Sequence, residues 1–152
     1  MSEFYAPDTI SGKEGKAYAN INGRNELLFF VRSLTASVEQ LKSEVRALGK
    51  RWVGHKVTGL QGSGSMSMYY MSPVFREQML EYSRTGKALY FDITIENDDP
   101  SSRAGRQEVL LKGCSLDSIN VAMLDSDSDD VLSEDVDFTF EGYEILKPFN
   151  RI

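Results

Sequence analysis

Cysteine is nearly absent from this sequence of 152 residues, in which Cys114 is the only one. A single cysteine can form neither an internal disulfide nor a multi-cysteine zinc site. We expect Cys114 to pack as a small apolar side chain rather than to act as a nucleophile. The fold should therefore depend on one compact hydrophobic core, which a chain of this length can bury.

Long hydrophobic runs are missing as well. The longest, residues 27–31, is far shorter than the roughly 18 apolar residues that indicate a membrane-spanning helix. The N-terminus has no basic residues followed by an apolar segment, so no secretory signal is predicted. We therefore expect synthesis in the cytoplasm and no direct membrane anchor.

Basic residues are in deficit, with 17 Lys and Arg against 23 Asp and Glu and a net charge of −6. Proteins that grip nucleic acid use a basic patch to neutralise phosphates and release counterions. The acidic residues here gather towards the C-terminal half. The composition argues against specific DNA binding and indicates a surface that repels DNA.

Two-residue alternation of apolar and polar side chains is the main pattern present, and it predicts an antiparallel β architecture. Asn22-Gly23 supplies the positive φ angles of a tight hairpin turn. Gly113 is expected to mark a bulge, and Pro148 suits the end of the last strand because it cannot donate to a sheet ladder. The expected strands are residues 16–21, 28–38, 65–71 and 89–95, one bent strand or two strands over 108–123, and a final strand around 135–141.

A single segment carries a helical signature. Ser72-Pro73 provides an N-cap residue followed by proline, and Gly86 suits the left-handed residue that ends a helix. The apolar positions that recur at helical spacing are Phe75, Met79 and Tyr82. The sequence therefore predicts a mainly β protein, an antiparallel β-sandwich or barrel with one α-helix at about 73–84, in a single domain spanning 1–152.

Residues 42–64 lack sustained periodicity of either kind and are rich in glycine, so they are predicted to form a long loop. The run from Gly59 to Gly64 superficially suggests a phosphate-binding loop. A Walker motif needs Lys and then Ser or Thr after its last glycine, whereas Ser65-Met66 follows here. A Rossmann motif should lead into a helix, whereas the alternation after Gly64 predicts a strand. Neither nucleotide nor any other cofactor is expected to bind.

Other candidate reactive sites fail on spacing or surroundings. Residues 125–130 begin like a calcium loop, but Asp130 stands where an EF-hand needs glycine and Val136 where it needs glutamate. A solvated acidic loop and a weak cation site are the two alternatives. His55, the only histidine, lies between glycine and lysine, which favours surface contact over a desolvated catalytic pocket. No catalytic, metal or cofactor site is predicted, and we do not expect an enzyme.

Four short motifs occur in an order that is specific when they are taken together. They are Thr9-Ile10-Ser11-Gly12-Lys13-Glu14-Gly15, Lys42-Ser43-Glu44-Val45, Gly54-His55-Lys56-Val57-Thr58-Gly59 and Phe138-Thr139-Phe140-Glu141. In this arrangement the chain resembles the tail tube proteins of contractile phage tails, particularly the PBSX-like defective prophage group. The resemblance extends over nearly the whole chain.

The resemblance implies a β-sandwich or barrel that forms hexameric rings, which stack into a tube inside a contractile sheath and serve as a conduit for DNA or effectors. It implies no catalysis, and DNA would pass without specific binding. The expected partners are further copies of the chain, the sheath protein, a tape-measure protein and baseplate or terminator proteins. The particle would assemble in the bacterial cytoplasm. An infectious phage, a defective prophage and a phage-tail-like bacteriocin stay open as sources.

The resemblance implies two groups of functional residues, one for subunit contacts and one facing the lumen. In related tubes a long loop reaches a neighbouring subunit or ring, and here that loop corresponds to residues 42–64. Its residues expected to make ring-stacking and subunit contacts are Lys42, Glu44, Lys50, Arg51, Trp52, His55 and Lys56. Acidic side chains on strand faces should meet solvent, because like charges are costly inside a core. Those expected to face the lumen are Asp92, Asp135, Asp137 and Glu141.

The main alternative is a ligand-binding β-sandwich module for carbohydrate or peptide. Such a module would be monomeric and would bind through a fixed surface. Size-exclusion chromatography and negative-stain microscopy separate the two interpretations, because only a tube subunit assembles.

Overall fold

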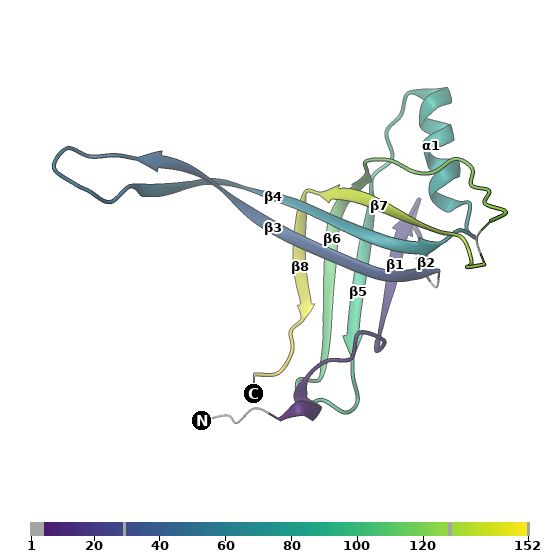
Figure 1. Ribbon diagram of the computed structural model, residues 1–152, viewed down its shortest axis with the longest axis horizontal. Helices are drawn as coiled ribbons and strands as arrows, with labels where there is room; N and C mark the ends of the chain where they lie inside the picture. The colour runs from purple at the N-terminus through teal and green to yellow at the C-terminus, as the bar shows by residue number, and fades with distance from the viewer. Residues whose placement is uncertain (1–4, 29, 128, 152) are drawn as a thin grey trace.

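The computed structural model describes residues 5–28, 30–127 and 129–151, and within them the chain is mostly antiparallel β-sheet with one α-helix (Figure 1). The predicted fold class is confirmed. The elements are the short 3-10 helix η1 (Ala6–Asp8), β1 (Gly15–Ile21), β2 (Arg24–Leu27), β3 (Val31–Val45), β4 (Gly54–Tyr69), α1 (Val74–Thr85), β5 (Phe91–Asp98), β6 (Arg106–Leu116), β7 (Ser133–Phe140) and β8 (Gly142–Lys147).

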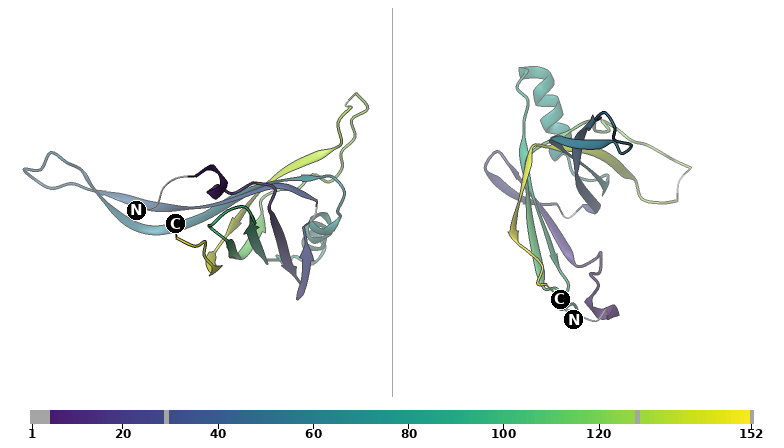
Figure 2. Two further views of the ribbon diagram at one scale, coloured as in Figure 1. Left: turned by 90° about the horizontal axis from the view of Figure 1, so that it is seen from below. Right: turned by 90° about the vertical axis from the view of Figure 1, so that its left-hand side faces the viewer.

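The strands follow the order β2-β1-β5-β6-β7-β4-β3, with β8 paired to β6, and every pairing is antiparallel. They form two layers that cross, one of β2, β1, β5, β6 and β8 and the other of β7, β4 and β3 (Figures 1 and 2). Strand β6 joins the layers, since most of it pairs with β5 while Ser115 and Leu116 pair with β7. Gly113, with φ 64°, lies just before this change of partner. The predicted 108–123 segment is therefore one bent strand, and it ends at Leu116.

The core lies where the two layers face each other. Phe75 of α1 closes one end, with its ring centroid 5.4 Å from that of Phe91 and 6.4 Å from that of Phe30. Cys114 is fully buried, and burial raises the pKa of its thiol to about 12, so its predicted packing role is confirmed. Other buried members of the core are Ala19, Ile93, Leu111, Met66, Met68, Val136 and Phe138.

Two local predictions are confirmed with small shifts. Asn22 (φ 53°) and Gly23 (φ 81°) form the hairpin turn between β1 and β2. The helix occupies Val74–Thr85 and ends on Gly86, which is left-handed with φ 73°. Its N-cap is Pro73 rather than Ser72, although the Ser72 hydroxyl still accepts a hydrogen bond from the Val74 N–H at 3.4 Å.

The prediction of a loop over residues 42–64 is wrong. Residues 42–45 and 54–64 belong to β3 and β4, which remain paired to the end, and only residues 46–53 connect them. We call residues 39–61 the arm and residues 46–53 the arm tip. The arm projects from the body as a twisted two-stranded ribbon (Figures 1 and 2). Most of its side chains are exposed on both faces, so there was no buried face to impose alternation on the sequence.

Two strand boundaries also differ from expectation. Strand β3 starts at Val31 rather than Leu28, and its register with β4 shifts between Val31 and Ser33, so Arg32 forms a bulge. The expected last strand is in fact two strands, β7 and β8, which meet at a corner on Glu141. Strand β8 pairs with β6 instead of continuing β7, and it ends directly before Pro148.

Candidate assembly surfaces

The sheet of β3, β4 and β7 has one face made of small polar and acidic side chains, which we call the polar face. Cross-strand register aligns them in three rows, Ser33–Ser67–Asp135, Thr35–Ser65–Asp137 and Ser37–Ser63–Thr139. The intervening residues Met66, Val136 and Phe138 are buried on the opposite side. Alternation therefore gives this sheet one apolar face and one face of hydroxyls and carboxylates.

Two glycines of β4 allow the apolar side to pack closely. A Cβ on Gly64 would overlap Cζ of Phe138, and one on Gly62 would lie 2.5 Å from Cε2 of Phe140. Each phenylalanine ring thus lies directly on the strand backbone. These glycines serve packing between strands rather than loop flexibility, which corrects the role that the glycine-rich pattern suggested.

The four acidic residues predicted to face a lumen do not lie together. Asp135 and Asp137 are exposed neighbours on the polar face. Asp92 lies in the other layer on β5, where its carboxylate accepts a hydrogen bond from the Gly113 N–H at 3.1 Å. Glu141 is exposed at the β7–β8 corner, and its N–H donates to the Lys112 carbonyl at 2.9 Å. The structure brings two of the four onto one surface.

Both margins of the polar sheet are open. Among the described residues, no strand other than β4 pairs with β3, so its outer edge is free over the whole length of the strand. Strand β7 pairs with β6 only through Phe138 and Thr139, and Asp117 adds a hydrogen bond from its N–H to the Asp137 carbonyl at 2.9 Å. Open edges of this kind can accept another strand.

The residues predicted to contact a neighbouring subunit all lie in the outer part of the arm, and all are exposed. Trp52 in the arm tip is 84% exposed, and Leu48 beside it is fully exposed. Glu44 forms an exposed ion pair with Arg46 at 3.1 Å and lies opposite His55 in the strand register. Pairing of β3 with β4 is what brings these separated sequence positions together.

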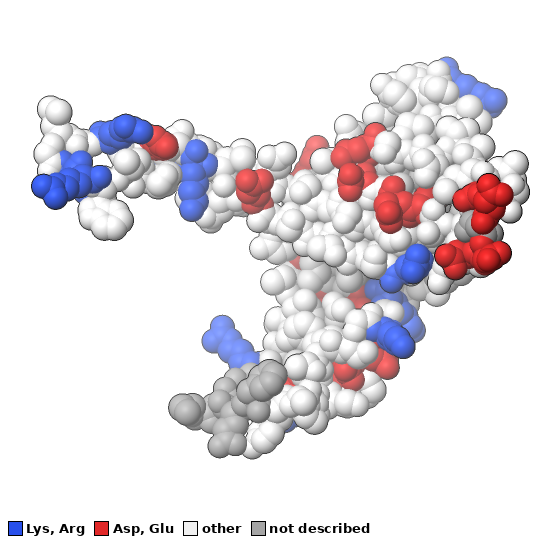
Figure 3. Space-filling view, viewed as in Figure 1, with Lys and Arg blue, Asp and Glu red and all other residues white. Residues whose placement is uncertain are grey.

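Basic and acidic residues are distributed unequally between the arm and the rest of the molecule. Residues 42–56 hold five basic residues and one acidic residue, which leaves 12 basic and 22 acidic residues in the rest of the chain. Figure 3 shows Lys and Arg side chains gathered at the far end of the arm, and Asp and Glu side chains over the body and at the opposite end. The arm is therefore a basic projection from an acidic body.

A buried ion pair that the sequence analysis missed fixes α1 to β7. Nη1 of Arg76 lies 2.8 Å from Oε1 of Glu134, whose side chain is 1% exposed. Arg76 also donates to the carbonyls of Ser72 and Asn120 at 2.6 and 3.3 Å, and its guanidinium lies 4.5 Å from the ring centroid of Tyr70. A signal was present, because Glu134 shares the inward phase of Val136 and Phe138.

No set of three or more His, Cys, Asp or Glu side chains in the described part of the chain is arranged to hold a metal ion. Within those same residues, the structure contains no helix with the length and apolar character needed to span a membrane. What the geometry offers is a set of surfaces: a polar sheet face, two open edges and a basic arm.

Comparison with known proteins decides what these surfaces belong to. A family model described as phage tail tube protein matches residues 2–147. The chain belongs to the phage tail tube protein family. It is 38% identical over 140 residues, 92% of each chain, to the phage-like element PBSX protein XkdM of Bacillus subtilis (strain 168). It is equally similar, at 38% over 140 residues, to the uncharacterized protein YqbM of the same strain.

Solved structures agree with this family. A structure of a Bacillus subtilis protein, 35% identical, superposes with a TM-score of 0.53 over 95% of this chain and 100% of that one. The anti-feeding prophage baseplate contains a chain of the same fold, with a TM-score of 0.69, 16% identity and coverage of 96% of this chain and 97% of that one. The resemblance to PBSX-like tail tube proteins is confirmed. The protein is a structural tail tube subunit and a component of a phage tail or virion-like particle.

Proposed function

We propose that this tail tube subunit forms hexameric rings, which stack into a hollow tube with the polar face lining the lumen. The observation that carries the proposal is the sheet of β3, β4 and β7, which combines three rows of serine, threonine and aspartate side chains on one face with two open edges. Joining the sheets of neighbouring copies around a ring would cover the β3 edge with the opposite margin of the next sheet, where β7 and the end of β6 lie. It would also give the channel a continuous wall of hydroxyls and carboxylates.

Strand direction favours a particular join. Every copy in a ring points the same way along the tube axis, so strands that meet keep their directions. In the order β6-β7-β4-β3 each strand is antiparallel to the next, which makes β3 antiparallel to β6 of an adjacent copy. The outer edge of β3 is therefore expected to pair with the neighbour's β6 end, near Ser115 and Leu116, in an antiparallel ladder.

The polar face suits a passage through which DNA or an effector moves without being held. Asp135 and Asp137 repel phosphate groups, and the serine and threonine side chains beside them offer no apolar or cationic grip. DNA is therefore a passing cargo in this proposal and not a ligand. We propose that the chain acts as a structural subunit and not as an enzyme. His55, the only histidine of the sequence, is exposed on the arm.

The other partners follow from a tube that is covered on the outside and closed at its ends. A contractile sheath protein would contact the outer wall, and tape-measure, baseplate and terminator proteins would contact the channel or the ends. Assembly would take place in the bacterial cytoplasm.

Electron microscopy of the purified protein tests the proposal. Negative-stain images are expected to show rings or stacked rings with six-fold symmetry and a central channel. A Ser65→Cys variant then tests the lumen, because a large polyethylene-glycol maleimide should label dispersed subunits quickly and assembled tubes slowly. A Glu77→Cys variant on the exposed side of α1 is the matched control. A chain that stays monomeric, or equal labelling of Ser65→Cys in both states, would contradict the proposal.

A further inference from the structure

The most exposed large apolar side chains of the described residues lie in two places. Among the described residues, the five most exposed large hydrophobic side chains are Leu48 at 104%, Leu124 at 96%, Trp52 at 84%, Val121 at 81% and Val131 at 74%. Two belong to the arm tip, and three belong to the segment before β7. We call residues 121–127 together with residues 129–131 the acidic loop. Apolar side chains this exposed on a folded chain indicate contact surfaces.

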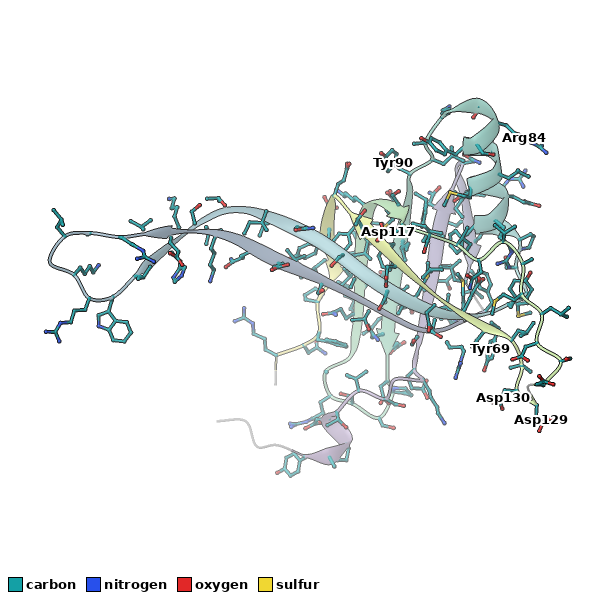
Figure 4. The ribbon with its side chains drawn as sticks, turned by 45° about the horizontal axis from the view of Figure 1, so that its top comes forward. Tyr69, Arg84, Tyr90, Asp117, Asp129 and Asp130 are labelled. Atoms are coloured by element: carbon teal, nitrogen blue, oxygen red, sulfur yellow. The ribbon has the colours of Figure 1, made fainter. Side chains whose placement is uncertain are left out.

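These two places lie at opposite ends of the same sheet. The acidic loop leads into Ser133, where β7 begins opposite Tyr69 at the end of β4, whereas the arm continues β4 in the other direction. In Figure 4 the loop residues Asp129 and Asp130 lie at the end of the molecule near Tyr69, far from the arm tip. Figures 1 and 2 show the same separation from other directions. One chain therefore cannot bring its own arm tip and acidic loop together.

The charges of the two places are opposite. Arg46, Lys50 and Arg51 are the charged residues of the arm tip, which has no acidic residue. Residues 113–146 contain ten acidic residues and no Lys or Arg, and four of those acids are Asp125, Asp127, Asp129 and Asp130 in the acidic loop. The two surfaces are thus complementary in charge as well as alike in exposed apolar side chains.

We propose that the arm tip of one copy binds the acidic loop of a copy in the adjacent ring. Trp52 and Leu48 would pack on Val121 and Leu124, while Lys50 and Arg51 would face Asp125 and Asp127. Such a contact joins two different patches, so it repeats head to tail and extends the stack. The occupant of the acidic loop is therefore a second copy of this chain.

The inference rests on the proposed tube, because the tube sets the relative placement of the copies. A sheet that closes around a ring has strands with a component along the ring axis. The arm and the acidic loop terminate opposite ends of that sheet, so they emerge on opposite faces of the ring. Stacking rings in one orientation then places the arms of one ring against the acidic loops of the next.

Charge reversal tests the contact. Lys50→Glu with Arg51→Glu, or Asp125→Lys with Asp127→Lys, places like charges in contact, and each pair of changes should raise the subunit concentration needed for assembly by about tenfold or more. Combining all four changes in one chain restores opposite charges and should restore tubes. The matched control is Glu77→Lys with Glu81→Lys on α1, which should assemble normally. Sedimentation and negative-stain microscopy measure the outcome.

Cross-linking supplies a readout that does not depend on assembly yield. Cys114 is fully buried and its thiol has a raised pKa, so cysteines introduced at the surface are the reactive ones. A chain with Val53→Cys and Ser126→Cys should give a ladder of covalent multimers with a short bis-maleimide when assembled. Chains with either cysteine alone, or with Val53→Cys and Ser83→Cys, should not give this ladder.

The outcomes separate the two proposals. The arm contact is wrong, and the proposed tube stands, if wild-type tubes form and any of three results is obtained. The chains with only the arm or only the loop charges reversed assemble normally, the chain with all four changes assembles no better than they do, or no cross-linked ladder appears. If the wild-type chain forms neither rings nor tubes, the proposed function fails and the arm contact fails with it.

Discussion

Strands β3 and β4 are built as one ladder but lie in two different surroundings. In the body, their inner face is covered, with the rings of Phe138 and Phe140 resting on Gly64 and Gly62. In the arm, the same ladder continues with both faces largely exposed. A two-stranded ribbon alone is only marginally stable in water. The body half of the ladder therefore stabilises the fold, while the arm half extends from it and is available to a neighbour.

Ion pairs give the largest expected contrast between body and arm. The Arg76–Glu134 pair is buried, with side chains 18% and 1% exposed, whereas the Arg46–Glu44 pair is exposed, at 76% and 59%. Arg76→Met leaves a buried carboxylate without its counter-charge and should lower the free energy of unfolding by about 3–5 kcal/mol. Arg46→Met, the matched change in the arm, should lower it by less than about 1 kcal/mol.

Urea unfolding of dilute, unassembled protein measures both variants. A second substitution, Glu134→Leu in the Arg76→Met background, should recover part of the loss because it removes the unpaired charge. Equal effects of Arg76→Met and Arg46→Met would show that burial does not separate body from arm.

Glycines provide the next contrast. A Cβ at Gly64 would meet the Phe138 ring and would also lie 2.6 Å from the Thr35 carbonyl oxygen, whereas a Cβ at Gly59 in the arm would lie 3.7 Å from Leu41. Gly64→Ala should therefore cost about 1–3 kcal/mol of stability through overpacking. Gly59→Ala makes an ordinary contact and should be neutral or slightly stabilising. Thermal unfolding followed by circular dichroism compares them, and a similar melting temperature for both variants would contradict the packing role of Gly64.

The same contrast explains what sequence patterns could and could not predict. Met66 and Met68 alternate with serines because one side of β4 is buried, so the strand was predictable there. Further along β4, neither side is buried, and the sequence from Gly54 to Gly59 carries no alternation although all of it except Thr58 is paired with β3. Pairing in the arm comes from continuation of the β3–β4 ladder out of the body, with a register shift between Leu41 and Lys42, so the information that sets it lies largely outside the arm's own residues.

The corner at Glu141 was unpredictable for a related reason. Most of β8 is exposed, and its sequence does not record that it pairs with β6 rather than extending β7. The exposed residues proposed for assembly were easier to single out, since Trp52 and the basic residues around it are unusual in a polar, glycine-rich segment. Asp92 was grouped with Asp135 because both are acidic residues on the outward face of a predicted strand, and neither charge nor phase specifies which layer a strand joins.

Thiol chemistry gives a smaller contrast that depends on pH. Burial raises the pKa of Cys114 from its ordinary value of 9.0 to about 12, so the folded state keeps the proton while the unfolded state loses it. The stability from this thiol is fully present below pH 9.0 and is lost as pH rises towards about 12. Relative to Cys114→Ala, the wild-type chain should lose unfolding free energy between about pH 9 and 10.5.

The matched change in the arm is Val53→Cys, which adds a thiol to a partly exposed position. Maleimide should label this cysteine within the time in which native Cys114 stays unlabelled. Rapid labelling of Cys114 in the folded chain, or a difference from Cys114→Ala that does not change with pH, would contradict its burial.

Shortening the arm should have the smallest effect on folding and a complete effect on assembly. Lys42 and Val57 are register partners, so residues 43–56 can be replaced by Asn-Gly, which closes a two-residue hairpin at that point. No core side chain is removed, so the free energy of unfolding should change by less than about 1 kcal/mol. The shortened chain lacks Trp52 and the basic tip and should not form tubes at concentrations at which the wild type does. Urea unfolding and negative-stain microscopy on the same sample measure both effects. Normal tubes would show that the arm is dispensable for stacking, and a large loss of stability would show that it supports the fold after all.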